Sequence, residues 1–278
     1  LSDTATVSIT VTAVNDAPVA SAGTVTTNED TDYSGTLSAS DVDGDALTYS
    51  VTTSPSNGSL SITTTSSSLS FDGTNDYVNM GNTSSLAIDG NVSISGWVKF
   101  SDFNNSLAAV MSIHSQTNGY AFEKTATANT LSFWVGDGSD DIEVTTNTLT
   151  ANTWYHVIGT NDGTTSKIYV DGSLANSTAQ GSPAGPTGDL KIGIHSYETA
   201  SSRYWNGNID EVAVWNDALT QAEVTALYNS GNGLSAASNS GDYTSSANLQ
   251  GYWKMDEGTG TSVADASSNS NTGTINGA

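Results

Sequence analysis

Aliphatic and aromatic residues alternate with small polar residues over many short stretches of this 278-residue chain. Successive side chains of a β-strand point to opposite faces, so such stretches predict half-buried strands. The predicted strands are 5–13, 47–52, 92–100, 131–136, 154–160, 167–170, 190–195 and 210–215. Asp-Gly pairs and Ser/Thr/Asn clusters separate them, and Asp171-Gly172 predicts a hairpin turn. Many short strands between such turns predict an all-β sandwich.

One helix is predicted over 220–230, after the last of these strands. Thr220 and Glu223 have the spacing of a capping box. Three apolar residues follow at helical spacing: Val224, Leu227 and Tyr228. Gly231 stands where a C-terminal cap is expected. The helix is short, and we expect it to cover one end of the sandwich.

The chain is strongly acidic, with 29 acidic and 6 basic residues and a formal net charge of −23. This balance argues against a nucleic-acid partner, which needs a basic surface, and against docking on an anionic membrane. No apolar stretch approaches the roughly 20 residues of a membrane span. With no cysteine, the chain has neither disulfides nor thiolate metal sites. A secreted protein of this kind depends on core burial or on hard cations such as Ca²⁺.

Composition changes along the chain and predicts two domains, 1–64 and 65–278. The first 64 residues hold eight acids, no basic residue and two aromatics, Tyr33 and Tyr49. All six Trp, all five Phe, all three His and every Lys and Arg come later. The Thr/Ser run 63–68 is the expected linker. The chain opens directly in a strand pattern, so we expect it to be a segment of a longer protein.

Six of the eight N-terminal acids fall in three motifs, Asn-Asp-Ala-Pro at 15–18, Asn-Glu-Asp-Thr at 28–31 and Asp-Val-Asp-Gly-Asp at 41–45. Together they resemble the cadherin-like repeats of large bacterial surface adhesins. The resemblance implies an extracellular, cell-surface location, neighbouring repeats of the same long chain as partners, and Ca²⁺ at the domain junction. The implied ligands are Asn15, Asp16, Glu29, Asp41 and Asp43. The alternative is that these acids only solubilise turns.

Motifs between 69 and 231 resemble the laminin-G-like, concanavalin-type jelly rolls of bacterial extracellular proteins. They are Leu-Ser-Phe-Asp-Gly-Thr-Asn-Asp-Tyr-Val at 69–78, Val-Ser-Ile-Ser-Gly-Trp-Val at 92–98, Thr-Trp-Tyr-His-Val at 153–157, Ile-Tyr-Val-Asp-Gly at 168–172 and Gly-Asn-Ile-Asp-Glu-Val-Ala-Val-Trp-Asn at 207–216. The resemblance implies a jelly-roll sandwich of two antiparallel sheets with a short C-terminal helix, preceded by a small cadherin-like β-sandwich portion.

The tail 248–278 contains Gly-Tyr-Trp-Lys-Met-Asp-Glu-Gly at 251–258. In the resembled family such a segment often opens the jelly roll, yet nothing like it precedes Phe71. The tail either starts a second, truncated module or supplies the missing strands to this one. We favour the second interpretation, because an orphan strand with Tyr252, Trp253 and Met255 would expose apolar surface.

Two kinds of site are candidates in the jelly roll, and the first is for Ca²⁺. In related jelly rolls the acid opening the last strand often holds this ion, and Asp210 matches that position. Asp256 of the tail is a candidate partner. Asp72 and Asp76 are further candidates, with the alternative that they serve turns.

The second candidate is a glycan site. Period-2 alternation puts Trp97, Trp134, Tyr169 and His195 away from the aliphatic face of their strands. The loop 196–205 adds Tyr197, Arg203, Tyr204 and Trp205. Aromatic rings on a sheet face can stack on sugar rings. The alternative is that these aromatics pack beneath loops.

Catalysis finds little support in the sequence. His114, His156 and His195 are far apart without metal-ligand spacing. Asp210 and Glu211 are adjacent in a strand, so we expect opposite faces. We therefore expect no enzyme, but a Ca²⁺-dependent adhesin segment whose jelly roll binds a glycan or another cell-surface ligand. The alternatives are a purely structural stalk and, less favoured, a polysaccharide-degrading enzyme.

Overall fold

The computed structural model describes residues 17–21, 23–28, 39–40, 52–53, 67–115, 117–126, 128–139, 141–196, 200, 203–258 and 260–277. The chain divides into two units, 1–65 and 66–278. In the first unit, β1 (Val19–Ala20) pairs antiparallel with β2 (Ala39–Ser40). The strand expected at 5–13 and most of that expected at 47–52 lie outside the described residues.

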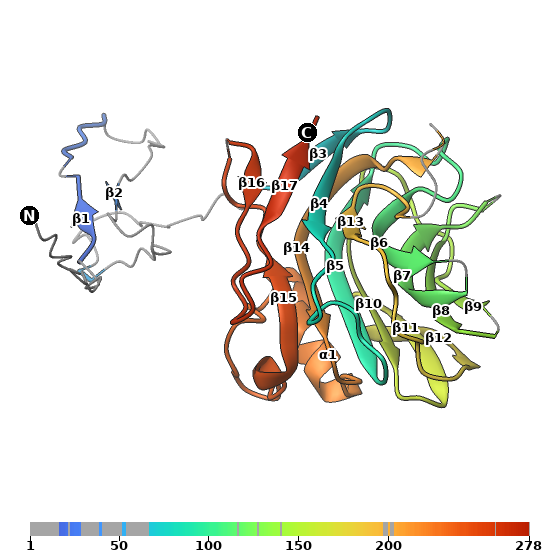
Figure 1. Ribbon diagram of the computed structural model, residues 1–278. Helices are drawn as coiled ribbons and strands as arrows, with labels where there is room; N and C mark the ends of the chain where they lie inside the picture. Colours follow the sequence, from blue (N-terminus) through green and yellow to red (C-terminus); the bar gives the residue numbers. More distant parts are fainter. Residues whose placement is uncertain are drawn as a thin grey trace, which may run out of the picture. The chain divides into compact units, whose positions relative to one another are not determined.

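The second unit is a sandwich of two antiparallel sheets (Figure 1). Over the described residues, one sheet has seven strands in the order β12-β11-β10-β5-β14-β15, with β3 also paired to β14. Their bounds are β3 (Leu69–Asp72), β5 (Val92–Phe100), β10 (Trp154–Asn161), β11 (Thr165–Val170), β12 (Ser173–Ala179), β14 (Asn206–Trp215) and β15 (Leu249–Trp253).

The other sheet has eight strands within the same described ranges, in the order β16-β17-β4-β13-β6-β7-β8-β9. Their bounds are β4 (Tyr77–Gly81), β6 (Ala109–Ser115), β7 (Asn118–Lys124), β8 (Leu131–Asp137), β9 (Asp141–Thr145), β13 (Leu190–Ile192), β16 (Ser262–Val263) and β17 (Gly273–Asn276). The expected all-β jelly-roll sandwich with a short helix is confirmed.

The main core lies between the two sheets and is built by strand alternation. Ile94, Val98 and Phe100 of β5 point into it and are at most 2% exposed. Phe122 of β7 and Phe133 of β8 meet them from the opposite sheet, fully buried. Polar and aromatic residues at the intervening positions therefore face outward from each sheet.

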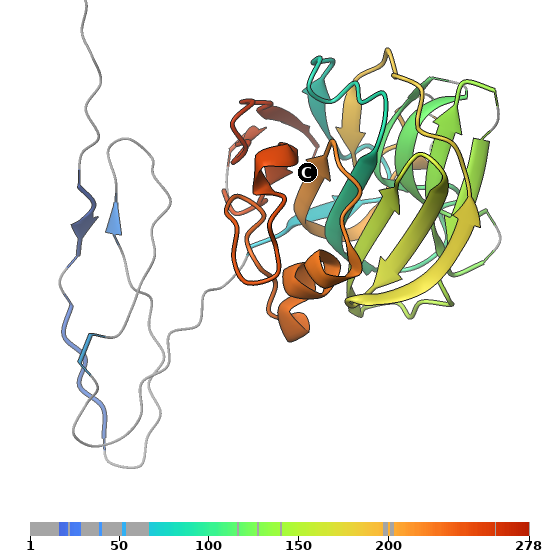
Figure 2. The same ribbon diagram turned by 90° about the horizontal axis from the view of Figure 1, so that it is seen from below.

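A second apolar layer covers part of the outer face of the seven-stranded sheet. Helix α1 (Gln221–Tyr228) supplies Val224 and Leu227 to it, and Trp215 and Tyr243 also belong to it, all at most 3% exposed. The helix lies beside β12, as Figure 2 shows. Gln221 Nε2 of the helix also donates to Gly172 O in the turn between β11 and β12, at 2.8 Å. This layer is why outward-facing residues of the seven-stranded sheet are not all exposed.

The helix begins as expected and ends slightly earlier. Thr220 is its N-cap, and the reciprocal capping box with Glu223 is present. Its C-cap is Asn229, in the left-handed conformation with φ 49°. Gly231, the expected cap, instead lies at the end of the 3₁₀ turn η2 (Asn229–Gly231). No helix among the described residues has the length and apolar character to cross a membrane.

The tail contributes strands to both sheets of the same unit. β15 pairs with the second half of β14, with Val212 opposite Trp253. β17 pairs with β4, with Asn276 opposite Tyr77. Trp253 is fully buried in the main core, and the short turn η3 (Ser246–Asn248) leads into β15. Segments far apart in sequence thus lie side by side in one sandwich (Figure 1).

Candidate functional site

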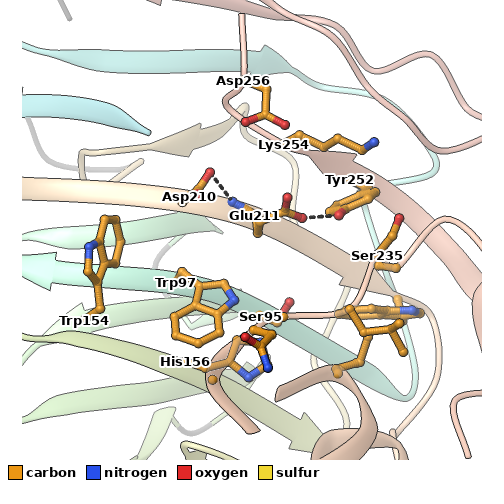
Figure 3. A pocket seen from close by; sticks show the side chains of 17 residues that line it. Ser95, Trp97, Trp154, His156, Asp210, Glu211, Ser235, Tyr252, Lys254 and Asp256 are labelled. Atoms are coloured by element: carbon orange, nitrogen blue, oxygen red, sulfur yellow. Dashed lines mark hydrogen bonds between the residues drawn. The ribbon is translucent and has the colours of Figure 1, made fainter. Parts of the chain in front are cut away.

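A cavity of about 430 Å³ opens on the outer face of the seven-stranded sheet, beside the second apolar layer (Figure 3). Strands β5, β10, β14 and β15 form its floor, and the segment 231–236 after the helix forms one wall. The residues that line it are Ser95, Trp97, Trp154, His156, Asp210, Glu211, Trp215, Leu227, Gly231, Asn232, Gly233, Leu234, Ser235, Ala236, Tyr252, Lys254 and Asp256. Its size lies within the roughly 300–1,000 Å³ range of small-molecule sites.

A β-bulge in β14 brings two acidic side chains to this cavity. Asp210 pairs with Trp97 and Ala213 with Ser95, so three steps along β14 match two steps along β5. The extra residue gives Glu211 a left-handed φ of 50°. Both acids therefore line the cavity, and the expectation that they point to opposite faces was wrong. Bulges re-aim side chains in this way, and the alternation rule does not foresee them.

Two tryptophans supply apolar surface to the cavity. The ring centroid of Trp97 lies 4.9 Å from that of His156 and 6.0 Å from that of Tyr228, so neighbours support Trp97. Trp154 begins β10 and remains 37% exposed. His156 is buried, and loss of solvation lowers its pKa to about 3, which keeps the imidazole neutral. The rings thus form an uncharged side of the cavity.

Charged groups gather on the other side of the cavity (Figure 3). Burial raises the pKa of Glu211, and the nearby charge of Asp256 raises it further. The hydroxyl of Tyr252, which donates to Glu211 Oε2, and the ammonium of Lys254 oppose this shift of the Glu211 pKa. Burial also raises the pKa of Asp256, against the opposing effect of Lys254. The carboxylates are therefore poorly solvated and close enough to repel one another.

The other aromatic and histidine candidates lie elsewhere. Trp134 and His195 are on the outer side of the eight-stranded sheet, with the ring of Trp134 beside His114. Tyr169 faces outward as expected, but it is 4% exposed in the apolar cluster with the helix. Trp205 is fully buried, its ring centroid 4.2 Å from that of Phe100. Trp205 therefore serves the core and not a ligand, which corrects our expectation.

The other described residues of the loop 196–205 do not line the cavity. Tyr197 lies outside the described residues. Arg203 and Tyr204 are half-buried, and Tyr204 forms an isolated bridge with Ile194. This bridge exists because β13 ends at Ile192, three residues before the expected end. Gly193 follows with φ 84°, a conformation that interrupts a strand.

The proposed Ca²⁺ ligands fall into three groups. Asn15, Asp16, Glu29, Asp41 and Asp43 all lie outside the described residues. Asp72 and Asp76 belong to the turn between β3 and β4. Asp72 Oδ1 accepts from Thr74 N, and Asp76 Oδ2 accepts from Asp72 N, each at 2.8 Å. These bonds are those of a turn, as the alternative interpretation has it.

Asp210 and Asp256 form the third group, and the cavity brings them together with Glu211. Carboxylate oxygens are the ligands that Ca²⁺ prefers, and a divalent cation would relieve the repulsion between them. Their donor chemistry therefore fits Ca²⁺. They are not a tightly assembled set, because ligand atoms of three His or acidic residues meet within 4.8 Å only at His114, Glu123 and His195 among the described residues.

That second cluster corrects another expectation. His114 Nε2 and His195 Nε2 lie 2.5 Å apart, although 81 residues separate them. Sequence spacing did not indicate this pair, because the two residues come together only where β13 lies beside β6 in the eight-stranded sheet. His156 is on the other sheet, in β10.

The cavity residues that were not among the expected ligand residues include Trp154, Glu211, Tyr252 and Lys254. Trp154 alternates with the core-facing Tyr155 and Val157, so periodicity could have placed it on the same face as Trp97. Tyr252 and Lys254 carry the same signal in the tail, on either side of the buried Trp253. Glu211 carries no such signal, because its position depends on the bulge.

Fold and cavity together define the class of protein by its architecture: a jelly-roll sandwich of two antiparallel sheets with an aromatic-lined, acidic cavity on one sheet. Residues 72–225 match the family model described as the concanavalin A-like lectin/glucanases superfamily. This match spans more than half of the chain, and the chain belongs to that superfamily, as the laminin-G-like resemblance implied.

A bacterial Ig domain model matches residues 15–98, which fits an Ig-like or cadherin-like portion before the jelly roll, where a cadherin-like one was expected. Its last part overlaps β3, β4 and β5, which belong to the sandwich. No curated protein matches the sequence.

Solved structures share the fold at low sequence identity. A Bacteroides ovatus protein, described as a candidate carbohydrate-binding protein, is 20% identical with a TM-score of 0.55. The match covers 75% of this chain and 59% of that one, so our chain spans about three-fifths of that protein. A heptameric pentraxin of Limulus polyphemus is 16% identical with a TM-score of 0.49, covering 67% of this chain and 90% of its own.

Domain 4 of an extracellular arabinanase of Geobacillus stearothermophilus, solved with arabinotriose, is 19% identical with a TM-score of 0.42. That match covers 51% of this chain and 68% of the domain.

Proposed function

We propose that the jelly-roll module binds a glycan in the cavity on the outer face of its seven-stranded sheet. The observation that carries the proposal is that indole rings and carboxylates line the same cavity. The rings are those of Trp97 and Trp154, and the carboxylates are those of Asp210, Glu211 and Asp256. Sugar rings have apolar C–H faces that suit indole rings, and hydroxyls that donate to carboxylates. The cavity offers both kinds of contact side by side.

The superfamily supports this proposal, since its description includes lectins. The Bacteroides ovatus protein of the same fold is itself described as a candidate carbohydrate-binding protein. Small-molecule sites combine an apolar lining with a few convergent polar groups, and this cavity has that composition.

Ca²⁺ is part of the proposal. Asp210 and Asp256 would hold the ion, with Glu211 as a third oxygen donor at the same opening. The bound ion would supply positive charge that attracts hydroxyl oxygens. This chain's own groups would do the rest: Lys254 partly offsets the acidic charge, Tyr252 orients Glu211, and the indole rings shield the ligand from water.

In this account the chain is an extracellular segment of a cell-surface adhesin, and its N-terminal portion links it to neighbouring repeats. The Ig-like match at 15–98 supports a repeat-containing protein. The acidic composition and the absence of cysteine suit a chain braced by cations rather than by disulfides.

A glycan array probed in CaCl₂, followed by calorimetric titration of the best hit, tests the proposal. Trp154→Ala is expected to weaken binding about tenfold, the loss of roughly 1.4 kcal/mol of contact energy. Because Trp154 is partly exposed, its replacement by Ala should leave the fold intact. Trp134→Ala is the matched control, since it removes a half-buried indole from the other sheet.

Failure to bind any glycan in CaCl₂ would favour the purely structural stalk. Equal losses in Trp154→Ala and Trp134→Ala would reject the cavity as the site. Loss of binding in EDTA, restored by CaCl₂, is expected if Asp210 and Asp256 hold the ion.

Glycoside hydrolysis is a second candidate function, favoured by one observation. Glu211 and Asp256 line the same cavity and both have a raised pKa. Glycosidases use such a pair, one carboxyl as acid and the other as base or nucleophile. Release of reducing ends from the bound glycan, abolished by Glu211→Gln, would identify an enzyme; intact glycan after long incubation supports the lectin.

A further inference from the structure

Two histidines and a glutamate meet on the outer side of the eight-stranded sheet, on the other sheet from the glycan cavity. His114 comes from β6, Glu123 from β7, and His195 from the segment after β13. Glu123 Oε1 lies 3.1 Å from His195 Nε2 and 3.5 Å from His114 Nε2. All three side chains are buried, at 7–8% exposure.

Hydrogen bonds outside the cluster hold together two of the segments that carry these residues. Ser196, next to His195, accepts from His114 N at 2.9 Å and contacts Ser112 Oγ at 3.0 Å through its hydroxyl. Ser196 N also donates to Ser112 Oγ at 3.2 Å. These bonds hold the segment after β13 against β6. The ring of Trp134, 4.7 Å from that of His114, packs beside the cluster.

The number of protons on the two Nε2 atoms determines which hydrogen bonds this cluster can form, and no number satisfies all three facing atoms. If both imidazoles carry their proton on Nδ1, three lone pairs converge on one point. If one Nε2 is protonated, its single proton satisfies only one of the two facing acceptors. If both are protonated, two N–H groups meet across 2.5 Å. A cation accepts all three lone pairs at once.

Charge leads to the same conclusion. A buried carboxylate is costly unless a positive group compensates it. Within the described part of the chain, the groups that could compensate Glu123 are the imidazoles of His114 and His195, and an imidazole does so only when it is protonated. The neighbouring Lys124 directs its ammonium to Thr125 O instead, at 2.8 Å.

We propose that His114, Glu123 and His195 bind a divalent transition-metal ion, of which Zn²⁺ is the type. Two imidazole nitrogens and one carboxylate oxygen are a ligand set that zinc accepts. Ca²⁺ takes six to eight oxygen ligands, so it is the wrong ion for this site. The metal would clamp the segment after β13 to β6 and β7, and would leave a coordination position for water or a fourth ligand.

Calorimetric titration of ZnCl₂ into the full chain, without a histidine tag and stripped of metal with a chelator, tests the proposal. One high-affinity Zn²⁺ ion per chain is expected, and CaCl₂ should not compete for it. His195→Asn and Glu123→Gln should each weaken Zn²⁺ binding by more than about 100-fold, since each removes a direct ligand. Glu143→Gln is the matched control, because it removes an exposed carboxylate of the same sheet that lies outside the cluster.

A second measurement on the unaltered protein covers the case in which a variant fails to fold. Nitrogen NMR of the histidine rings should show Zn²⁺ shifting the Nε2 signals of His114 and His195, with those of His156 unchanged. Absence of a bound ion, unchanged affinity in folded His195→Asn, or displacement of Zn²⁺ by CaCl₂ would each overturn the proposal. None of these results depends on a glycan, so the outcome is independent of the proposed function.

Discussion

Single residues decide what this cavity offers a ligand, and several of them are held in unfavourable states. Glu211 adopts a left-handed φ of 50° and is poorly solvated. Asp256 adds repulsion from the same opening. Strain and desolvated charge that the fold tolerates at one place are expected where a ligand later compensates them.

Glu211→Gln tests this at the residue scale. Because burial raises the pKa of Glu211, its charge destabilises the fold at pH values above that pKa. Gln removes the charge and can still accept from Tyr252. We expect the metal-free variant to gain about 1 kcal/mol in free energy of unfolding at neutral pH. Urea denaturation measures it, with the exposed Glu143→Gln as control; an equal or lower stability than the parent contradicts the explanation.

Side-chain periodicity predicted part of the site and missed part of it for physical reasons. Trp97 follows the alternation of β5, and Trp154 could have been found in the same way. Glu211 could not, because one extra residue in β14 changes its direction. Trp205 looked like a loop residue, yet its backbone N–H donates to Gly193 O and its ring enters the core. The His114–His195 pair depends on strand order, which local pattern does not contain.

At the scale of elements, Glu223 joins the helix to the segment before β15. Its Oε2 accepts from Thr220 N and Oγ1, both at 3.0 Å. Its Oε1 accepts from Ser245 Oγ at 2.6 Å and Thr244 Oγ1 at 3.1 Å. The capping box was visible in the sequence, whereas the bonds to 244–245 required the fold. One carboxylate thus fixes the layer that walls the cavity.

Glu223→Gln is expected to destabilise the module by about 1–3 kcal/mol, since the new amide would face hydroxyl donors it cannot accept from. Burial opposes ionisation of Glu223, but these hydrogen bonds outweigh it and lower its pKa below the ordinary value. Its contribution is therefore present above about pH 4.3 and lost as pH falls through the lowered folded-state pKa. Thermal unfolding of the parent and the variant across this pH range measures that contribution. The difference between their Tm values should shrink in acid, and a difference that stays constant would refute the stabilising role of the Glu223 carboxylate.

The order of strands in the seven-stranded sheet also explains the apolar pattern of the tail. The buried pattern of Tyr252, Trp253 and Met255 indicated a strand that needs a partner. The structure provides that partner in β14, whose edge is shared by β3 and then β15. The bulge at Asp210 and Glu211 lies between these two pairings, so the cavity forms where one neighbour of β14 ends and the next begins. Asp256 follows β15 to the same place.

At the scale of the whole molecule, the formal charge of −23 makes the chain repel itself unless cations bind. If Ca²⁺ binds the folded form at about 100 times its Kd, it adds about 2.7 kcal/mol of stability. For a chain of this size that corresponds to a shift of roughly 5–10 °C in Tm.

Treatment with EDTA is therefore expected to lower the Tm by about this amount, and CaCl₂ to restore it where MgCl₂ does not. Differential scanning calorimetry of the full chain measures both steps. A Tm that EDTA leaves unchanged contradicts Ca²⁺ as a stabilising ion. Recovery with ZnCl₂ alone would assign the effect to the histidine cluster.

The central claim is that the cavity on the seven-stranded sheet is the glycan site, and the six tryptophans of the chain test it directly. Each indole N–H gives its own NMR signal, which single Trp→Phe variants assign. Titration with the best glycan from the array should shift the signals of Trp97 and Trp154, and leave those of Trp134, Trp205 and Trp253 in place. A glycan that shifts Trp134 instead, or that binds without moving either cavity indole, would contradict the account.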